Sequence, residues 1–375
     1  MATLAATAAF AQSSVTLSGN ADGGVINHNS QAYGADGFGA NVNGSSTSFL
    51  AFSGTEDLGG GLSAGFKGVH LINTASGLTN NGATPYQTSN FFNDEIWIGI
   101  DQAGVGGIKI GAPNAGMHET NSKSQPFGTA WGGGYTSTAG TVNRLLGSHT
   151  ALGVNQYVGG TNANGRVIRA EKSIRFDTAV FNGFSANYVY APGNDRSSTT
   201  TSNTNEFTNA TVNYSNGPLN LAYSTAQAKG GVDNVAASAA SLTAGGAFQT
   251  NSALNKNSSV KYTFLAANYT YGPATVYYGK TTGKTNALTG GDKEVSSNNY
   301  AIKYALNGNL DLLANSLRVS DKVGTADQSL TAVSAIYKLS KRTSTYATTV
   351  RQDLDTSNNN AGRLNSTLLG IRQQF

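Results

Sequence analysis

The sequence predicts an all-β protein, a closed transmembrane antiparallel barrel of about sixteen strands. Three observations support this fold class. Short segments with period-two alternation of polar and apolar residues recur along the chain, tight turns alternate with long polar connections, and the composition combines low charge with many aromatic residues. No stretch reaches the roughly 18 consecutive apolar residues that a membrane-spanning helix requires, so the predicted spans are strands.

The composition argues against a soluble domain with a dry core. Of the 375 residues, 47 are Gly, 12% are charged and 38% are hydrophobic. Typical soluble domains are about 25% charged and about 45–50% apolar. Disorder would explain both low values, but 17 Tyr and 15 Phe are too many for a disordered chain. A barrel with a wet interior resolves the conflict, because only every second strand residue must be apolar. We therefore expect Val, Leu, Ile, Tyr and Phe to face outward, while Ser, Thr, Asn, Lys and Arg line the water.

The segment 299–306 shows the alternation most clearly, since Tyr300, Ile302 and Tyr304 fall on one face and Lys303 on the other. Runs of this kind predict strands at 14–25, 46–55, 62–73, 92–101, 106–112, 167–180, 184–191, 206–215, 219–228, 258–271, 274–283, 298–307, 310–321, 328–339, 343–353 and 365–375. Polar connections rich in Ser, Thr, Asn and Gly occupy about 26–45, 74–91, 192–205, 230–257, 284–297 and 354–364. Short turns on one side and long loops on the other are typical of outer-membrane barrels, whose long loops are extracellular and whose short turns are periplasmic.

One connection, residues 112–165, is much longer than the others. It lacks strand periodicity but contains Phe127, Trp131, Tyr135 and Tyr157. Loops beyond about 12–15 residues are usually functional or disordered. Because these aromatic side chains must be buried somewhere, we expect this segment to fold into the lumen as a constriction loop.

The first residues read MATLAATAAFA, a small apolar run that ends in an Ala-Phe-Ala pattern typical of a signal-peptidase cleavage site. We interpret residues 1–11 as the remnant of a signal peptide and residues 12–375 as a single barrel domain.

No motif indicates an enzyme, a metal site or a cofactor. The chain has no Cys, and its four His residues share no metal-ligand spacing. A Ser/His hydrolase would need a His held by an Asn or an acid beside a nucleophilic Ser, and no such pair stands out among the many Ser and Asn residues. A net charge of +4 without a basic run does not favour nucleic-acid binding. We expect no enzymatic activity and no cofactor.

Several segments resemble the general porins of β-proteobacteria, a family of trimeric sixteen-stranded outer-membrane barrels. The two most specific are residues 53–62, SGTEDLGGGL, and residues 337–347, YKLSKRTSTYA. The start at 14–19, the strand at 169–176 and the ending GIRQQF at 370–375 are also similar. The resemblance covers the chain from residue 14 to its end. It departs from the family pattern where Phe49 and Ser53 stand in place of basic residues, and this puts the charge of the pore in doubt.

The resemblance implies a homotrimer in the Gram-negative outer membrane. Its expected partners are membrane lipid, lipopolysaccharide, small hydrophilic solutes, anions and the barrel-assembly machinery, which recognises a terminal strand such as the one ending in Phe375. The expected function is passive diffusion of small hydrophilic solutes and ions, with weak anion preference. The alternative is a barrel that acts through its extracellular loops as an adhesin or a solute-specific binding channel.

Strand parity and the long loop select the charged residues expected to line the pore. They are Lys67, Glu95, Glu119, Lys123, Arg144, Arg169, Glu171, Arg175, Asp177, Lys303, Arg318, Arg351 and Arg372. Among them Arg169 and Arg175 are the best candidates for a positive track along the wall that faces the loop.

Overall fold

The computed structural model describes residues 14–30, 37–74, 91–92, 94–130, 134, 172–192, 206–229, 259–286, 294–321, 328–354 and 362–375. Within these ranges the chain forms one 17-stranded sheet and one helix, α1 (Gly116–Ser124). No helix in the described part of the chain is long and apolar enough to cross a membrane. Residues 1–11, interpreted as a signal-peptide remnant, lie outside the described residues.

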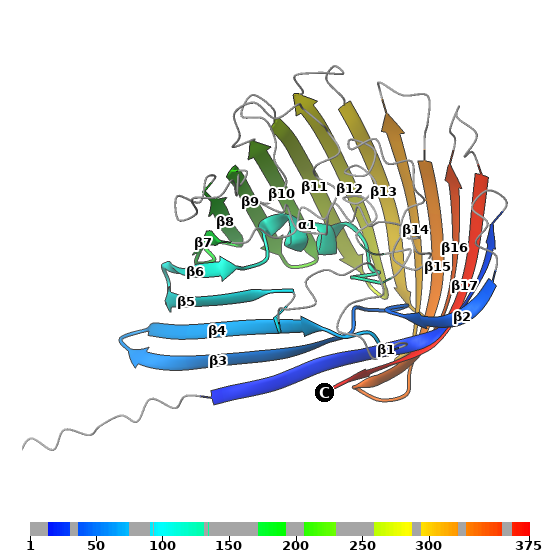
Figure 1. Ribbon diagram of the computed structural model, residues 1–375, viewed down its shortest axis with the longest axis horizontal. Coiled ribbons are helices and arrows are strands. Elements are labelled where there is room, and N and C mark those ends of the chain that lie inside the picture. Colours follow the sequence, from blue (N-terminus) through cyan, green and yellow to red (C-terminus); the bar gives the residue numbers. More distant parts are fainter. Residues whose placement is uncertain are drawn as a thin grey trace, which may run out of the picture.

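The sheet is a closed antiparallel barrel, which confirms the predicted fold class (Figure 1). The strands are β1 (Ser14–Ser30), β2 (Gly37–Val42), β3 (Phe49–Gly59), β4 (Leu62–Leu71), β5 (Ile96–Gln102), β6 (Gly106–Ala112), β7 (Ser173–Thr178), β8 (Phe184–Ala191), β9 (Glu206–Asn216), β10 (Leu219–Lys229), β11 (Ser259–Tyr271), β12 (Ala274–Asn286), β13 (Glu294–Ala305), β14 (Leu310–Asp321), β15 (Gln328–Lys338), β16 (Thr343–Leu354) and β17 (Gly362–Gln374). Closure occurs where β1 pairs with β17 on one side and with β2 and β3 on the other. Since β2 and β3 pair with successive parts of β1, they share one position, and the barrel has sixteen positions.

The prediction that residues 26–45 form a loop was wrong. The structure extends β1 to Ser30 and forms β2 inside this range. The segment is rich in Asn, Gly and Ser, which suggested a loop. Its backbone is instead paired by β17, in a register that runs from Asn20–Gln374 to Ser30–Leu364. Pairing across the barrel closure satisfies the backbone groups regardless of side-chain polarity.

Strand length distinguishes two walls of the barrel, which are joined at the closure by β1 to β4. The short wall comprises β5, β6, β7 and β8, with 7, 7, 6 and 8 residues. The long wall comprises β9 to β17, whose strands have between 11 and 13 residues. Figure 1 shows the short strands in cyan and green beside α1, and the long strands continuing around to the red C-terminal end. The constriction loop leaves the barrel from the short wall, between β6 and β7.

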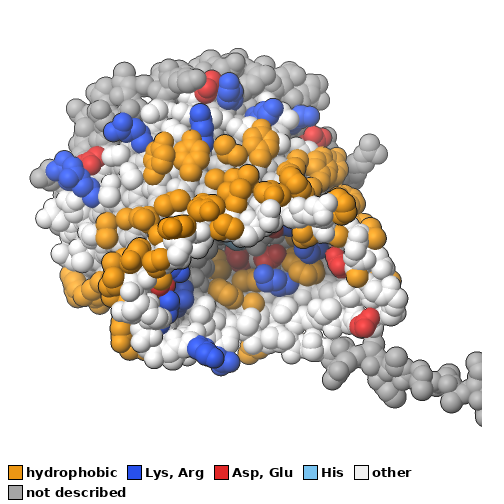
Figure 2. Space-filling view, turned by 180° about the vertical axis from the view of Figure 1, so that it is seen from behind, with side chains coloured by type: hydrophobic (Ala, Val, Ile, Leu, Met, Phe, Trp, Pro, Cys, Tyr) orange, Lys and Arg blue, Asp and Glu red, His pale blue; other side chains and the backbone are white. Residues whose placement is uncertain are grey.

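The outer surface carries an apolar belt. Outward side chains such as Ile98, Ile110 and Tyr300 are 66%, 56% and 60% exposed. Figure 2 shows hydrophobic side chains gathered in a band across the visible face. Exposed apolar area on this scale is costly in water, but lipid tails can cover it. The alternation predicted for 299–306 is confirmed, because Tyr300, Ile302 and Tyr304 are all on this exposed face.

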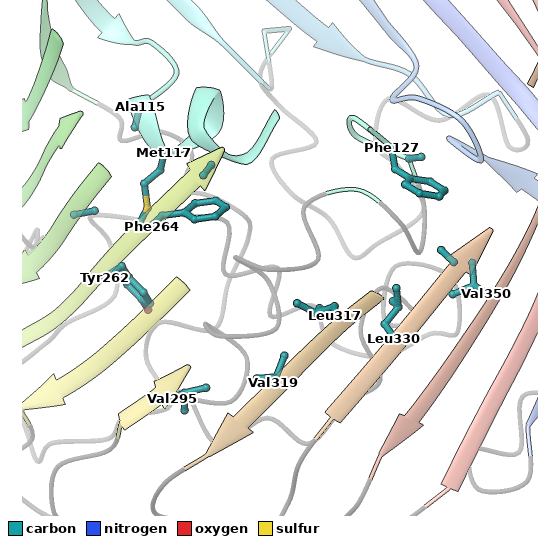
Figure 3. Close-up of a cluster of buried hydrophobic side chains, with 14 of the residues drawn as sticks. Ala115, Met117, Phe127, Tyr262, Phe264, Val295, Leu317, Val319, Leu330 and Val350 are labelled. Atoms are coloured by element: carbon teal, nitrogen blue, oxygen red, sulfur yellow. The ribbon is translucent and has the colours of Figure 1, made fainter. Parts of the chain in front are cut away.

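The inner face is less polar than expected, which corrects the expectation that large apolar residues face only outward. Tyr262, Phe264, Leu317, Leu330 and Leu368 lie on the inner face of the long wall and are at most 1% exposed. Figure 3 shows such side chains pointing from the long strands toward α1 and Phe127. Met117 of α1 and Phe127 belong to the same buried cluster. The constriction loop therefore has an apolar surface to pack against inside the barrel.

Candidate functional site

Helix α1 lies inside the barrel and defines which strand faces point inward (Figure 1). The Lys123 ammonium donates to Asn213 Oδ1 at 2.6 Å. Asn268 donates to the backbone oxygen of Lys123 at 3.1 Å, and Asn299 donates to that of Ser124 at 2.9 Å. Three strands of the long wall thus hold the C-terminal end of α1. Residues that share the parity of these asparagines, or lie directly opposite them across a strand pair, also face inward.

The short wall and the neighbouring strand β4 bring charged side chains together inside the barrel, beginning with Glu95 just before β5. Its carboxylate accepts hydrogen bonds from Lys67 Nζ at 2.7 Å and from Trp97 Nε1 at 2.9 Å. It also accepts from the side-chain amide of Asn114, at the start of the constriction loop, at 3.2 Å. Glu95 is 6% exposed, so its charge is largely compensated by the Lys67 ammonium and these donors.

Arg175 on β7 is the centre of a second group. Its guanidinium donates to Asp177 Oδ1 at 2.6 and 2.8 Å, to Glu119 Oε1 at 2.5 Å and to the backbone oxygen of Asn114 at 2.6 Å. Asn187 on β8 donates to the other oxygen of Glu119 at 3.2 Å. Because Glu119 lies in the first turn of α1, Arg175 fixes the N-terminal end of the helix to the short wall.

Lys109 on β6 completes the cluster, although sequence analysis did not select it. Its ammonium lies 2.9 Å from Asp177 Oδ2 and 5.2 Å from the centre of the Trp97 ring, where a cation–π interaction is favourable. The signal was present, because Lys109 stands between Ile108 and Ile110, and period-two alternation places it on the inner face.

Two further contacts position the constriction loop. A Cβ at Gly116 would lie within 2.5 Å of Thr211 and Asn187, so only glycine permits this approach of α1 to the wall. At the other end, the backbone N–H of Thr47 donates to Thr129 Oγ1 at 2.8 Å. The segment around Thr47 is itself fixed by Asp22, which accepts from the backbone N–H groups of Gly44, Ser45 and Ser46 and from the Tyr346 hydroxyl. The described part of the loop therefore crosses the lumen from the short wall to the barrel closure.

The cluster holds four basic and three acidic side chains in the described residues, and they differ in their exposure. These are Lys67, Lys109, Lys123 and Arg175 against Glu95, Glu119 and Asp177. The Lys67, Glu119 and Lys109 side chains are 37%, 37% and 31% exposed, whereas that of Arg175 is 8% exposed. A solute in the lumen thus meets two lysines and one carboxylate more directly than the arginine. Burial lowers the pKa of the Lys123 ammonium in α1, and the nearby Glu119 carboxylate partly opposes this shift. Figure 2 shows acidic and basic side chains inside the hollow of the molecule.

The other predicted pore residues are placed as follows. Lys303 and Arg372 share the inner faces of β13 and β17 with Asn299 and Leu368, and Lys303 is ion-paired with Asp311 at 3.1 Å. Lys338, not selected from the sequence, lies 2.9 Å from the same carboxylate. Arg144, Arg169 and Glu171 lie outside the described residues, so the predicted track from Arg169 to Arg175 stays a prediction.

The predicted inward positions of Arg318 and Arg351 were wrong. Asn299, which faces α1, is directly opposite Leu317, so the next residue, Arg318, faces outward. Leu317 is directly opposite Leu330 on β15, and Leu330 is directly opposite Gln352 on β16, so Gln352 faces inward. Its neighbour Arg351 therefore faces outward as well. Both arginine side chains are exposed on the outer surface.

The fold and this cluster define a class of protein: a membrane barrel whose lumen is narrowed by an inserted loop and lined there by mixed charges. The sequence profile described as "Gram-negative porin" matches residues 1–357. The chain belongs to the Gram-negative porin family and is an outer-membrane β-barrel protein.

Individual relatives agree with this assignment. Outer membrane porin protein 32 of Delftia acidovorans is 30% identical over 253 residues, which are 66% of this chain and 64% of that protein's length. The structure is similar to that of an anion-selective porin from Comamonas acidovorans, with a TM-score of 0.74 and 23% identity over 97% of this chain and all of that one. It is also similar to OmpT of Vibrio cholerae in its trimer form, with a TM-score of 0.63 and 11% identity over 97% of this chain and 99% of that one.

Proposed function

We propose that this porin is a passive diffusion channel for small hydrophilic solutes and ions with a weak preference for anions. The observation that carries the proposal is the charge cluster at the inserted loop, where four cations face three carboxylates within the described residues and two of the three most exposed charges, Lys67 and Lys109, are basic. Selectivity in such pores depends on the width and charge of the narrowest point. One net positive charge gives a modest preference that salt screens, since the Debye length is about 10 Å at 0.1 M.

The comparisons support the same sign of charge selectivity. One structure with this fold is described as anion-selective. We extend that property to this chain as part of the proposal, because β4, the short wall and α1 of this chain supply the cations independently of the comparison. The rival function, adhesion or solute-specific binding through extracellular loops, depends mostly on residues outside the described ranges and has no comparable support from the described ones.

We also propose that residues 112–165 act as a constriction loop and that the chain works as a homotrimer. Support for the loop comes from the contacts of residues 114–129 with both walls. Support for the trimer comes from the OmpT trimer form and from the uncharged outer face of the short wall, which suits contact with a second copy. Membrane lipid and the barrel-assembly machinery are proposed as further partners. Phe375, which exchanges backbone hydrogen bonds with Gly19 at the barrel closure, is proposed as the assembly signal.

The test is the zero-current potential across a KCl gradient in a planar bilayer. The parent protein is expected to show anion preference at low salt that fades as salt rises. Lys67→Gln combined with Lys109→Gln removes two exposed cations but keeps Arg175 and its carboxylates in place. This variant is expected to become cation-selective, because Lys123 and Arg175 would then face three acidic groups.

The matched control is Lys280→Gln, which removes one cation from the outer face of β12. It is expected to leave the potential unchanged. Cation preference of the parent at low salt, or a double variant with parental selectivity, would contradict the proposal.

A further inference from the structure

Two segments that resemble the porin family lie side by side at the turn-side end of the long wall. Residues 337–347 contain the end of β15, a turn and the start of β16, and residues 370–375 contain the end of β17. Lys338 is directly opposite Ser344, which is directly opposite Arg372. Each has the same parity as the buried apolar side chains of its strand, so the three form one row on the inner face.

This row contains hydrogen-bond donors that have no protein partner. Ser344 is 5% exposed, and its hydroxyl forms no hydrogen bond with any residue in the described ranges. The buried Nε atom of Arg372 forms none either, and Arg372 has no ion pair with any residue that the structure describes. Buried polar groups without a protein partner usually bind a water molecule or an ion. The Ser344 hydroxyl and the Arg372 guanidinium can therefore donate to a ligand that offers acceptor oxygens.

Basic side chains outnumber the acids around the row. Lys338 and Lys303 share the carboxylate of Asp311, at 2.9 and 3.1 Å, so two cations contact one anion. Both lysine side chains stay accessible from the lumen, with exposures of 42% and 40%, and Arg372 is partly exposed. An anion that enters this end of the lumen can therefore reach all three cations.

Asp22 on β1 is directly opposite Arg372 but is not its ion-pair partner. The Asp22 carboxylate instead accepts hydrogen bonds from three backbone N–H groups and from the Tyr346 hydroxyl. With this carboxylate counted, the cations still outnumber the acids by one. Lys341 and Arg342, in the turn that joins β15 to β16, are exposed and make no ion pair within the described part of the chain. They add to the positive potential at this mouth of the lumen.

We propose that Lys338, Ser344 and Arg372 form a binding site for the phosphate group of small solutes at the turn-side mouth of the lumen. Lys338 and Arg372 are two strand spacings apart, or about 10 Å, so their long side chains can meet on an oxyanion beside Ser344. Arginine binds phosphate through its forked donors and lysine as a point charge. Short turns of outer-membrane barrels are periplasmic, so this site lies where a solute leaves the pore toward the cell. It shares no residue with the charge cluster at the inserted loop.

The experiment uses the full chain refolded in detergent and measures its affinity for inorganic phosphate from the broadening of the phosphorus NMR signal. Arg372→Gln is expected to lower the affinity at least about tenfold, because a charge-assisted hydrogen bond and an attractive charge are lost. Ser344→Ala keeps every charge and is expected to lower it about threefold, through loss of the hydroxyl donor alone. The matched control, Arg318→Gln, removes one cation from the outer face of β14 and is expected to keep parental affinity. If Arg372→Gln does not assemble, Ser344→Ala decides.

A second comparison separates this site from the selectivity cluster. Lys67→Gln with Lys109→Gln is expected to keep parental phosphate affinity, whatever happens to its zero-current potential. If this double variant loses phosphate affinity while Arg372→Gln and Ser344→Ala keep it, phosphate binds at the inserted loop and the mouth site is refuted, although the proposed channel function stands. Displacement of phosphate by an equal concentration of chloride would also overturn the proposal, because the row would then supply only a diffuse positive potential.

Discussion

In the short wall, β5 to β8, charged side chains point into the lumen and the outward side chains are uncharged. In the long wall, β9 to β17, the half nearest the long connections has the opposite arrangement, with Leu317 and Leu330 buried inside and Lys280 and Arg318 outside. The two walls share one sheet and one alternation of side chains. Which face carries the charge therefore depends on what each face meets, not on the strand pattern itself.

The difference follows from the path of the constriction loop. The loop leaves between β6 and β7, and the charges of Glu119 and Lys123 on α1 require partners on the nearby inner faces. Farther around the barrel the inner face meets apolar side chains of the loop, such as Phe127, and becomes apolar itself. The outer face of the long wall carries the cations Lys280 and Arg318 instead. The following predictions test this contrast, beginning with the largest expected effect.

The outer face of the short wall should not tolerate charge. Ile110→Lys places a cation in the middle of an apolar surface, directly opposite Ile98. A lysine at the bilayer midplane of a barrel costs about 2–4 kcal/mol, and in the proposed trimer it would also place a charge in an apolar contact between copies. We expect loss of the heat-modifiable trimer on a gel. Thr331→Lys, an exposed outward position between Ser316 and Arg351 on the long wall, should assemble normally. If the Ile110→Lys variant assembled normally, the outer faces of the two walls would not differ in their tolerance of charge.

Shortening an apolar side chain on the inner face of the long wall should destabilise the protein more than shortening one on its outer face. Leu317 is 1% exposed on the inner face of β14, whereas Leu312 is 39% exposed on the outer face of the same strand. Leu317→Ala leaves a cavity, and the free energy of unfolding should fall by about 2–4 kcal/mol. Leu312→Ala should have a smaller effect because lipid or detergent fills the space. Urea unfolding in detergent micelles measures both, and equal losses would show that the inner apolar face is not packed.

The smallest expected effect concerns Lys123, whose helix connects the two walls. Because burial lowers the pKa of its ammonium below the ordinary 10.5, Lys123 loses its charge at a lower pH than an exposed lysine. Anion preference should therefore weaken as pH rises toward that range. Lys123→Arg should keep anion preference and lack this pH-dependent component, because arginine stays protonated. The zero-current potential measured against pH gives the result, and an identical pH profile for both proteins would exclude Lys123 as the titrating group.

Much of the fold could be predicted because alternation is a local property. The patterns at 299–306 and 173–177 placed Tyr300, Arg175 and Asp177 on the faces where the structure has them. Short turns were equally local. At Asn182 and Gly183, φ values of 48° and 84° are those of a tight hairpin turn, and an Asn-Gly pair adopts them readily.

The errors have one physical origin. In the segment 310–319, Leu310 and Leu312 have one parity while Leu313, Leu317 and Val319 have the other, so both faces are apolar and the pattern does not say which is outward. On β16, Tyr346 and Val350 were expected outside, but they pack inside. In both strands the contacts of the inner face decided which side chains point inward. The predictions that Arg318 and Arg351 face the lumen were therefore wrong for the same reason.

By itself the sequence determined most of the strands, the position of the long loop and the family, because each depends on local pattern or on short sequence motifs; it missed β2, whose residues read as a polar loop. Only the tertiary structure decided which charges meet in the lumen. Lys67, Glu95, Lys109, Glu119 and Arg175 come from different strands and from α1, and their pairing depends on barrel closure and on the path of the loop. The same closure turned Arg318 toward the membrane, because side-chain direction in a sheet is relative until one face has a partner.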